Sequence, residues 1–200
     1  LGLLPHSTIP GVQALMQVSG TTENGDKALK PDAIGFRLGP RINAVGRIGE
    51  PPLVIDLLST DDMGIALERA MQCEQINQTR QGMCHDIERE AIECGAREEI
   101  DLMETRVLVP ISDSWHHGVI GIVASRLVER YGVPVFICTY EEEDKQQVRG
   151  SARGIPEFNV FEALEYCKDL LSKHGGHPAA GGFSLPEENL EAFRSRLSEF

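Results

Sequence analysis

The sequence predicts an α/β protein in which one long helix joins a small helical segment to a lobe with a mixed β-sheet. Two patterns lead to this prediction. Apolar residues recur at helical spacing over residues 60–99. Further on, two β-type segments enclose a helical one at a spacing typical of a parallel strand pair with a right-handed crossover. The 200 residues, 41% of them hydrophobic, allow one large domain or two small ones with a proper core.

The first 59 residues favour short helices. Pro10 is suited to begin a helix near 10–18, and an apolar helical stretch covers 53–58. Between them, Pro40 can begin another helix whose first N–H groups face an anion. Asn43 and Arg47 would then share one face of that helix. A structural turn with solvated arginines is the alternative for this segment.

The long helix is expected over residues 60–99. Ser59 or Thr60 can cap it, and the two aspartates that come next suit the positive end of the helix dipole. Gly82 costs about 1 kcal/mol relative to alanine without breaking the helix. About 40 residues at 1.5 Å each would span about 60 Å, which is typical of a connector between two lobes.

The second lobe, residues 101–200, alternates strands and helices. Its expected strands are 106–111, 133–140 and 146–151, and its expected helices are 119–130, 159–172 and one that begins after Pro186. Residues 175–182 are expected to form a glycine-rich loop.

The formal net charge of −12 disfavours nucleic acid or an anionic membrane as a partner for the chain as a whole. The acidic excess is uneven, however. Three windows contain basic residues or histidines and no acid, namely 36–47, 145–153 and 171–182. Each is rich in glycine, whose backbone can approach a ligand closely, and arginine matches phosphate with two hydrogen bonds. We therefore interpret the three windows as phosphate sites in an otherwise acidic protein.

Residues 146–155, which overlap the second window, have the alternation of a half-buried strand. The small residues Val148, Gly150 and Ala152 fall on one face, and the other face carries Arg149, Ser151 and Arg153. This second face would make the floor of a groove. A strand edge protected by charge is the alternative.

Two further motifs contain histidines. In Gly-Gly-His-Pro-Ala-Ala-Gly-Gly (175–182), close packing alone does not explain the glycines, so we expect close backbone approach to a ligand, with His177 donating to a phosphate. In Trp-His-His-Gly (115–118), we expect the adjacent histidines to point in different directions, which favours an anion contact over a metal site. Trp115 is either a core residue or a platform for base stacking.

The five cysteines are widely spaced, with no C-x-x-C pair, and no apolar run approaches the roughly 18 residues that a transmembrane helix needs. This pattern indicates a reducing, cytoplasmic location. Because the chain begins with Leu1 and ends within a helical pattern, we expect it to be a fragment of a longer protein.

Together, the ordered motifs GPRINAVGR (39–47), WHHGVIGIVASRL (115–127), GSAR (150–153) and GGHPAAGG (175–182) resemble the RecJ family of bacterial single-stranded-DNA exonucleases. That family belongs to the DHH phosphoesterase superfamily. The resemblance implies 5′→3′ removal of nucleotides from single-stranded DNA with Mn²⁺ or Mg²⁺, in DNA repair and recombination. It also implies that residues 1–59 end the DHH catalytic lobe, 60–100 form the connecting helix and 101–200 form the DHH-associated substrate-binding domain.

The resemblance further assigns roles to individual residues. Near the scissile phosphate or the 5′ end it places Arg41, Asn43 and Arg47. On the other side of the DNA it places Ser151 and Arg153 as phosphate ligands, and Gly175, Gly176 and His177 as a phosphate loop with His116 nearby. Gly154 stands where many relatives have a polar residue, so no contact is assigned to it.

The chief departure from the family is that the sequence has no D-x-D and no D-H-H motif. Two-metal hydrolysis needs several carboxylates and histidines. We therefore expect no metal and no catalytic residue in this chain, and a monomer that binds single-stranded DNA weakly and does not cut it. Two alternatives stay open: a DHH-family phosphodiesterase for short oligonucleotides or small nucleotides, and a scaffold whose acidic helix contacts a partner.

Overall fold

The computed structural model describes residues 3–21, 30–97 and 101–200, and it divides into two compact units. Unit 1 comprises Leu1–Gly82 and unit 2 comprises Met83–Phe200. The long helix α5 (Met63–Arg97) contributes to both. None of the helices in the described ranges is long and apolar enough to cross a membrane.

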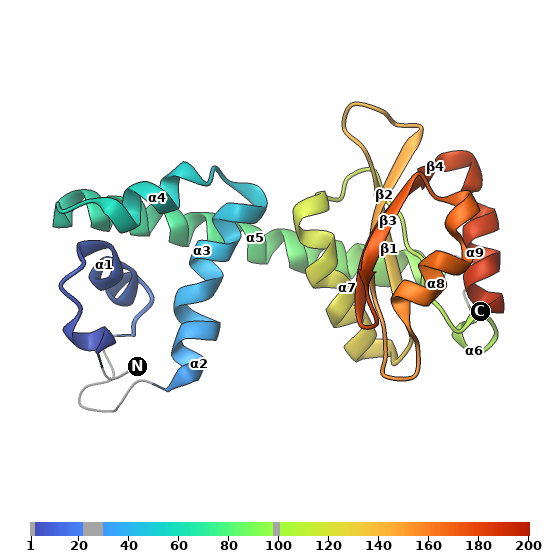
Figure 1. Ribbon diagram of the computed structural model, residues 1–200, viewed down its shortest axis with the longest axis horizontal. Helices are drawn as coiled ribbons and strands as arrows, with labels where there is room; N and C mark the ends of the chain where they lie inside the picture. Colours follow the sequence, from blue (N-terminus) through green and yellow to red (C-terminus); the bar gives the residue numbers. More distant parts are fainter. Residues whose placement is uncertain (1–2, 22–29, 98–100) are drawn as a thin grey trace. The chain divides into compact units, whose positions relative to one another are not determined.

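Unit 1 is helical (Figure 1). Its elements are η1 (Leu4–His6), α1 (Pro10–Val18), α2 (Pro31–Ala33), η2 (Ile34–Leu38), α3 (Gly39–Ile48), α4 (Pro52–Ser59) and the first part of α5. The predictions of helices near 10–18 and 53–58 are confirmed. The core gathers one apolar stripe from each of the longer helices, together with Leu38, namely Ala14, Leu15, Met16, Leu38, Val45, Leu57, Ala66, Ala70 and Cys73.

The helix that contains Pro40 does not begin there, as the sequence suggested. Helical structure runs without interruption from Pro31 through η2, a turn of π-helix, into α3. The N–H of Gly39 bonds to the carbonyl of Ile34, five residues earlier. This wider turn accommodates a proline, which has no N–H to donate. The expected anion site at a helix start before Pro40 is therefore absent from this described segment.

Helix α5 lies within the predicted range 60–99, whose last two residues are outside the described ones. Its cap differs from the expectation. The side chain of Asp62 accepts a hydrogen bond from the N–H of Ile65 at 2.9 Å, whereas Thr60 ends α4. Asp62 also brings a negative charge to the positive end of the helix dipole. It therefore acts both as the cap, which the sequence assigned to Ser59 or Thr60, and as a favourable charge.

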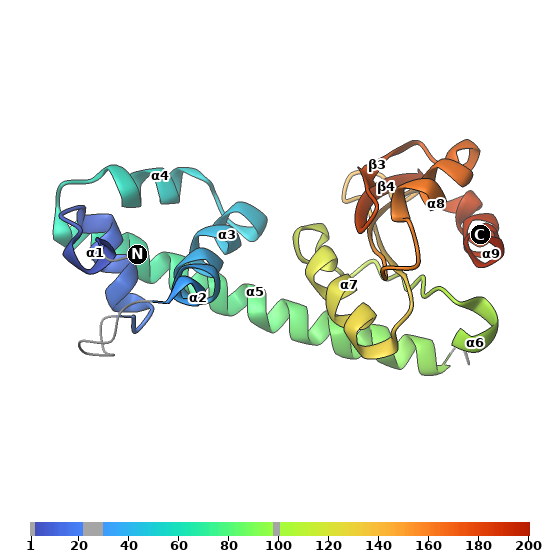
Figure 2. The ribbon, with the colours of Figure 1, turned by 60° about the horizontal axis from the view of Figure 1, so that its bottom comes forward.

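Unit 2 contains a sheet in which the described strands have the order β1-β2-β4-β3, each pair antiparallel. The strands are β1 (Val135–Tyr140), β2 (Gln147–Arg153), β3 (Lys173–His177) and β4 (Ala180–Pro186). Helices α8 (Val160–Tyr166) and α9 (Leu190–Glu199) cover one face (Figures 1 and 2). Phe136, Phe183 and Phe193 meet in the core between them. Helix α7 (His117–Tyr131), predicted at 119–130, packs on β1 and β2.

Three details of unit 2 differ from the predictions. Residues 106–111 form two isolated parallel bridges to β1, at Leu108 and Ile111, rather than a strand, so the named sheet is antiparallel. The expected loop 175–182 is instead the hairpin of β3 and β4. The helix expected at 159–172 is α8 and then a short turn, η3 (Lys168–Leu170).

The remaining short helices of unit 2 are α6 (Leu102–Thr105) and η4 (Glu187–Asn189).

Candidate functional site

The face of the sheet opposite α8 and α9 carries three rows of aligned residues across β2, β4 and β3. The strand register aligns Arg149 with Ser184 and Lys173, Ser151 with Gly182 and Gly175, and Arg153 with Ala180 and His177. Residues two apart along a strand lie on the same face, so all nine share one side of the sheet. Here the structure brings together four of the residues that the sequence selected, namely Ser151, Arg153, Gly175 and His177.

Helix α7 packs on this face over β1 and β2, and beside it lies a groove of about 570 Å³. The groove is lined by His117 and Ile120 of α7, by Glu141, and by strand residues that include Arg149, Ser151, Lys173, Gly182 and Ser184. A second, smaller depression shares His117, Glu141 and Arg149. Polar groups from three strands and a helix therefore converge on one groove.

Two of its cations are not neutralised by the protein. Among the described residues, neither Arg149 nor Lys173 has an ion-pair partner within 4.0 Å. Some other arginines of unit 2 are paired, for example Arg126 with Glu88 at 3.0 Å and Arg194 with Glu191 at 3.0 Å. Glu141 lines the groove without pairing with Arg149 in this way. The groove therefore keeps positive charge for an anion from outside.

Close packing does not explain the glycines of this face, Gly175 and Gly182, because a Cβ at either position would meet no steric clash. A Cβ built on Gly175 would meet nothing within 4 Å, and one built on Gly182 would have the Gly150 carbonyl oxygen at 3.9 Å as its nearest neighbour. Gly150, on the other face, differs, because its Cβ would lie 2.1 Å from a ring carbon of Phe183. Gly175 and Gly182 are paired directly across β3 and β4. They leave a strip of bare backbone between the two charged rows.

Arg153 is half-buried against α7, and its guanidinium donates to the Ser151 hydroxyl at 3.2 Å and to the Ala152 carbonyl at 2.7 Å. Gly121 of α7 makes room for both side chains, since a Cβ there would lie 2.8 Å from the Ser151 hydroxyl oxygen and 3.1 Å from a guanidinium nitrogen of Arg153. His177, in the β3–β4 turn, accepts at Nδ1 from the Ala179 N–H at 3.4 Å. That acceptor role leaves Nε2 as the donor of the neutral ring.

The two adjacent histidines stack, with ring centroids 4.8 Å apart and an interplanar angle of 15°, so the expectation that they point apart is wrong. His116 caps α7 by accepting at Nδ1 from the Gly118 N–H at 3.0 Å. This hydrogen bond holds the His116 ring in place, and the His117 ring stacks on it. Partial burial lowers the pKa of His117; Arg149 and His116 lower it further, whereas Glu142 and Glu141 raise it.

Two residues of the third window have structural contacts of their own. His174 bonds to Glu165 of α8 at 2.7 Å, and this bond lowers the pKa of the Glu165 carboxyl. Gly176 has a φ of 159°, and a Cβ there would lie 2.4 Å from the Ala180 carbonyl oxygen. The close turn of the hairpin therefore explains this glycine by itself, and the structure does not group it with Gly175 on the open face.

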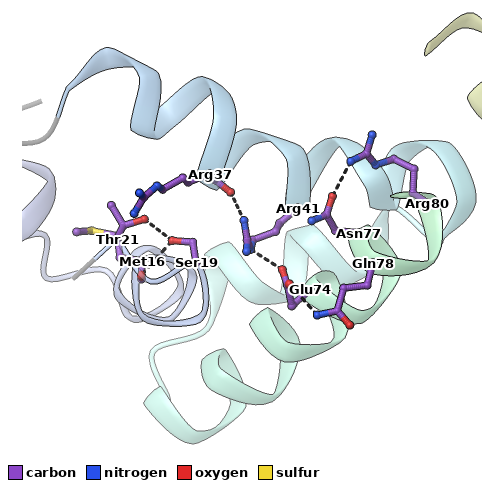
Figure 3. A network of polar contacts seen from close by, with 9 residues as sticks. All are labelled: Met16, Ser19, Thr21, Arg37, Arg41, Glu74, Asn77, Gln78 and Arg80. Atoms are coloured by element: carbon purple, nitrogen blue, oxygen red, sulfur yellow. Dashed lines mark hydrogen bonds and ion pairs between the residues drawn. The ribbon is translucent and has the colours of Figure 1, made fainter. Parts of the chain in front are cut away.

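The three selected residues of unit 1 lie on α3. Arg41 is half-buried and forms an ion pair with Glu74 of α5 at 2.6 Å, and it also donates to the Arg37 carbonyl (Figure 3). Asn43 and Arg47 are exposed and line a shallow groove with Ile42, Gly46, Pro51, Val54 and Ile55. The predicted common face of Asn43 and Arg47 is confirmed, while the charge of Arg41 is already balanced within unit 1.

The sequence places Arg149 in the floor of a groove but assigns it no ligand, and it assigns no individual role to Lys173 or His117. The signals were present for two of them, because Arg149 and Lys173 lie in acid-free windows. Arg149 also alternates with the small residues of β2. Lys173 could not be placed beside it without knowing that residues 173–177 form a strand. For the two histidines, spacing alone could not tell which one caps α7 and which one lines the groove.

The remaining candidates are structural. Trp115 is buried; its indole N–H donates to Glu90 at 2.8 Å, and its carbonyl accepts from the buried Thr139 hydroxyl at 2.7 Å, so it is a core residue. The five cysteines all lie within the described residues, and they form no disulfide bond there. Among the described residues, no group of three or more His, Cys, Asp or Glu side chains is arranged to hold a metal ion. These residues do not fit a two-metal centre.

Comparison with known protein families gives a match to the DHHA1 domain over residues 104–200, which includes the whole sheet and groove of unit 2. The matched residues therefore carry both the unpaired Arg149 and Lys173 and the unobstructed glycines of the open face.

The whole chain is similar to RecJ proteins. It is 40% identical over 190 residues to "Single-stranded-DNA-specific exonuclease RecJ" of Bacillus subtilis. The aligned region covers 94% of this chain and 23% of that relative. It is 33% identical over 195 residues to the Escherichia coli protein of the same name, and the aligned region covers 95% of this chain and 33% of that protein. The crystal structure of RecJ with Mg²⁺ from Thermus thermophilus matches with a TM-score of 0.83 and 30% identity, covering 98% of this chain and 29% of that one.

These findings confirm the resemblance that the ordered motifs indicated. The chain spans only about a quarter to a third of the length of these relatives. Solved RecJ structures contain Mg²⁺ or Mn²⁺. Since the described residues do not fit such a centre, no hydrolytic step is assigned to them.

Proposed function

We propose that this chain is part of an exonuclease that removes nucleotides from the 5′ end of single-stranded DNA, and that the DHHA1 domain binds the DNA backbone. The observation that carries the proposal is the open sheet face, where a strip of bare glycine backbone lies between two charged rows. One row contains Arg153 and His177; the other contains Arg149 and Lys173, which have no ion pair with any described residue. Lysine and arginine contribute most of the affinity for a phosphate backbone. The names of the relatives, single-stranded-DNA-specific exonucleases, support the same substrate.

In the DHHA1 domain, Ser151, Arg153 and the backbone at Gly175 and Gly176 bind phosphate, with His177 donating from Nε2. In unit 1, Arg41, Asn43 and Arg47 bind phosphate near the 5′ end. His116 acts indirectly, because its ring positions His117. Hydrolysis in the complete enzyme uses a divalent metal, Mn²⁺ or Mg²⁺, held by residues other than these. The enzyme works as a monomer in the cytoplasm, in DNA repair and recombination.

The decisive experiment uses the full-length protein with Mn²⁺ and oligonucleotides labelled at either end. We expect release of mononucleotides from the 5′ end of a long single strand and little attack on blunt duplex. Arg153→Gln and His177→Gln should each lower kcat/KM on the long strand by about tenfold or more, as expected when a charge-assisted hydrogen bond is removed. Arg130→Gln is the matched control, since Arg130 lies in the last turn of α7, over the ring of Tyr131.

Two results would contradict the proposal. A preference for a dinucleotide over the long strand would favour the short-oligonucleotide phosphodiesterase. Unchanged processing by a variant with alanine at Arg41, Arg153 and His177 would favour the scaffold.

A further inference from the structure

Arg149, Ser184 and Lys173 form a row at one end of the open face, where the register aligns the three residues across β2, β4 and β3. All three line the groove of about 570 Å³. Within the described chain, no carboxylate pairs with Arg149 or Lys173, and both side chains are exposed. Two cations that flank a hydroxyl form a site suited to an anion.

The spacing of the rows fixes how this site relates to the one at Arg153 and His177. Arg149 and Arg153 are four residues apart on β2, which corresponds to about 13 Å at 3.2–3.4 Å per residue. At the 3.4 Å rise per nucleotide of a stacked strand, this distance separates phosphates about four nucleotides apart, and fewer when the strand is extended. The two ends of the face are therefore too far apart for a single phosphate.

The middle row suits a polymer that crosses from one end to the other. Between the charged rows lie Ser151, Gly182 and Gly175, and the two glycines present only backbone toward the groove. A sugar-phosphate chain can lie against such a strip, whereas a side chain at either position would stand in its path. Glu141 lines the groove near Arg149. Its charge opposes the binding of an isolated anion, so the row depends on a ligand that is anchored elsewhere.

We propose that Arg149, Ser184 and Lys173 form a second phosphate subsite that takes a non-adjacent phosphate of the same single strand. This inference rests on the proposed function and adds a length requirement to it. A dinucleotide reaches only the subsite at Ser151, Arg153 and His177. A longer strand reaches both, so its affinity rises with length until the second row is occupied.

The test is a length series of 5′-phosphorylated oligothymidylates, from two to twelve nucleotides, bound to the full-length protein in EDTA. Fluorescence anisotropy gives Kd at several salt concentrations. The variant is Arg149→Gln/Lys173→Gln. We expect the gain in affinity from the shortest to the longest oligonucleotide to fall at least about tenfold. The slope of log K against log salt should decrease by about 1.4 for long strands, because each phosphate that is no longer neutralised lowers it by about 0.7, and dinucleotide binding should not change.

Two controls keep the result specific. Arg130→Gln/Lys168→Gln removes the same charge from unit 2 away from the groove, since Arg130 lies by Tyr131 and Lys168 pairs with Glu165 at 3.8 Å. It should leave the length series unchanged. Arg149→Lys/Lys173→Arg keeps both charges and should restore the salt slope. Thermal unfolding of each variant shows whether it is folded.

The outcomes separate the two proposals. If the wild type binds long strands and Arg149→Gln/Lys173→Gln retains the full gain with length, the second subsite is refuted and the proposed function stands. If the variant loses affinity equally for every length, the row is not a separate subsite, and the inference is likewise refuted. If the wild type binds no single strand at any length, the proposed function itself fails.

Discussion

Arg41 in unit 1 and Arg149 in unit 2 are both basic residues of glycine-rich segments that contain no acid, but the structure surrounds them differently. Arg41 is half-buried, paired with Glu74 at 2.6 Å and bonded to the Arg37 carbonyl. Arg149 is exposed, with no ion pair to any described residue. One cation stabilises the fold around it, and the other keeps its charge available.

This contrast shows which kinds of partner a local charge pattern can reveal. Alternation along β2 already places Arg149 on the face away from the core, so its exposure follows from the segment itself. The partner of Arg41 comes from α5, the next long helix. An acid-free window therefore indicates a cation without an ion pair only where the tertiary structure brings no acid to it.

The largest expected effect comes from filling the open face. Gly182→Val should lower the affinity of the full-length protein for a long single strand by about 10–100-fold, as expected for the loss of one charge-assisted hydrogen bond or more. Its Cβ has space, and a β-branched residue suits a strand, so the melting temperature should not fall. Anisotropy titration and thermal unfolding measure the two quantities.

The matched control is Gly150→Val, on the neighbouring strand but the opposite face. Its Cβ would lie 2.1 Å from the Phe183 ring, so we expect a loss of about 1–3 kcal/mol in unfolding free energy from overpacking. If Gly182→Val instead destabilised the protein as much as Gly150→Val and left binding intact, the open face would have a packing role and the contrast would disappear.

The sequence predicted the elements whose hydrophobic residues follow one clear helical or strand period. It did not predict the elements that form only because they pair with another strand. Helix α7 and the alternation of β2 follow from local pattern. Strand β3 does not, because glycine and histidine have little β propensity, and its pairing with β4 holds it in place. Residues 106–111 have strand-like composition, but Pro110 has no N–H to donate and only isolated bridges form.

The second expected effect tests the other side of the contrast. Glu74→Gln should lower the unfolding free energy by about 1–2 kcal/mol, between the values for exposed and buried pairs, because it leaves the half-buried Arg41 without its partner. Arg149→Gln should change it by less than about 0.5 kcal/mol. Denaturant unfolding monitored by circular dichroism measures both.

A double-mutant cycle with Arg41→Gln and Glu74→Gln isolates the pair from other effects of each substitution. A coupling energy near zero, or an Arg149→Gln variant as unstable as Glu74→Gln, would mean that the two arginines do not differ in the way described.

The smallest expected effect concerns His117, whose pKa reports the charge of the groove directly. Partial burial, Arg149 and His116 hold this pKa below the usual value, while Glu142 and Glu141 oppose the shift. Arg149→Gln should therefore raise the His117 pKa, and Glu141→Gln/Glu142→Gln should lower it, as measured by NMR titration of the ring protons. Because a lowered pKa means that the unfolded chain binds the proton more readily, unit 2 should lose a little stability as the pH falls from about 6.5 through the folded pKa of His117. Below that pKa it should lose no more.

A bound oligonucleotide phosphate near His117 should raise the His117 pKa. It should raise it less in Arg149→Gln/Lys173→Gln, in which the second subsite is weakened. A His117 pKa that moved with neither the substitutions nor the DNA would mean that Arg149 does not face the groove in solution.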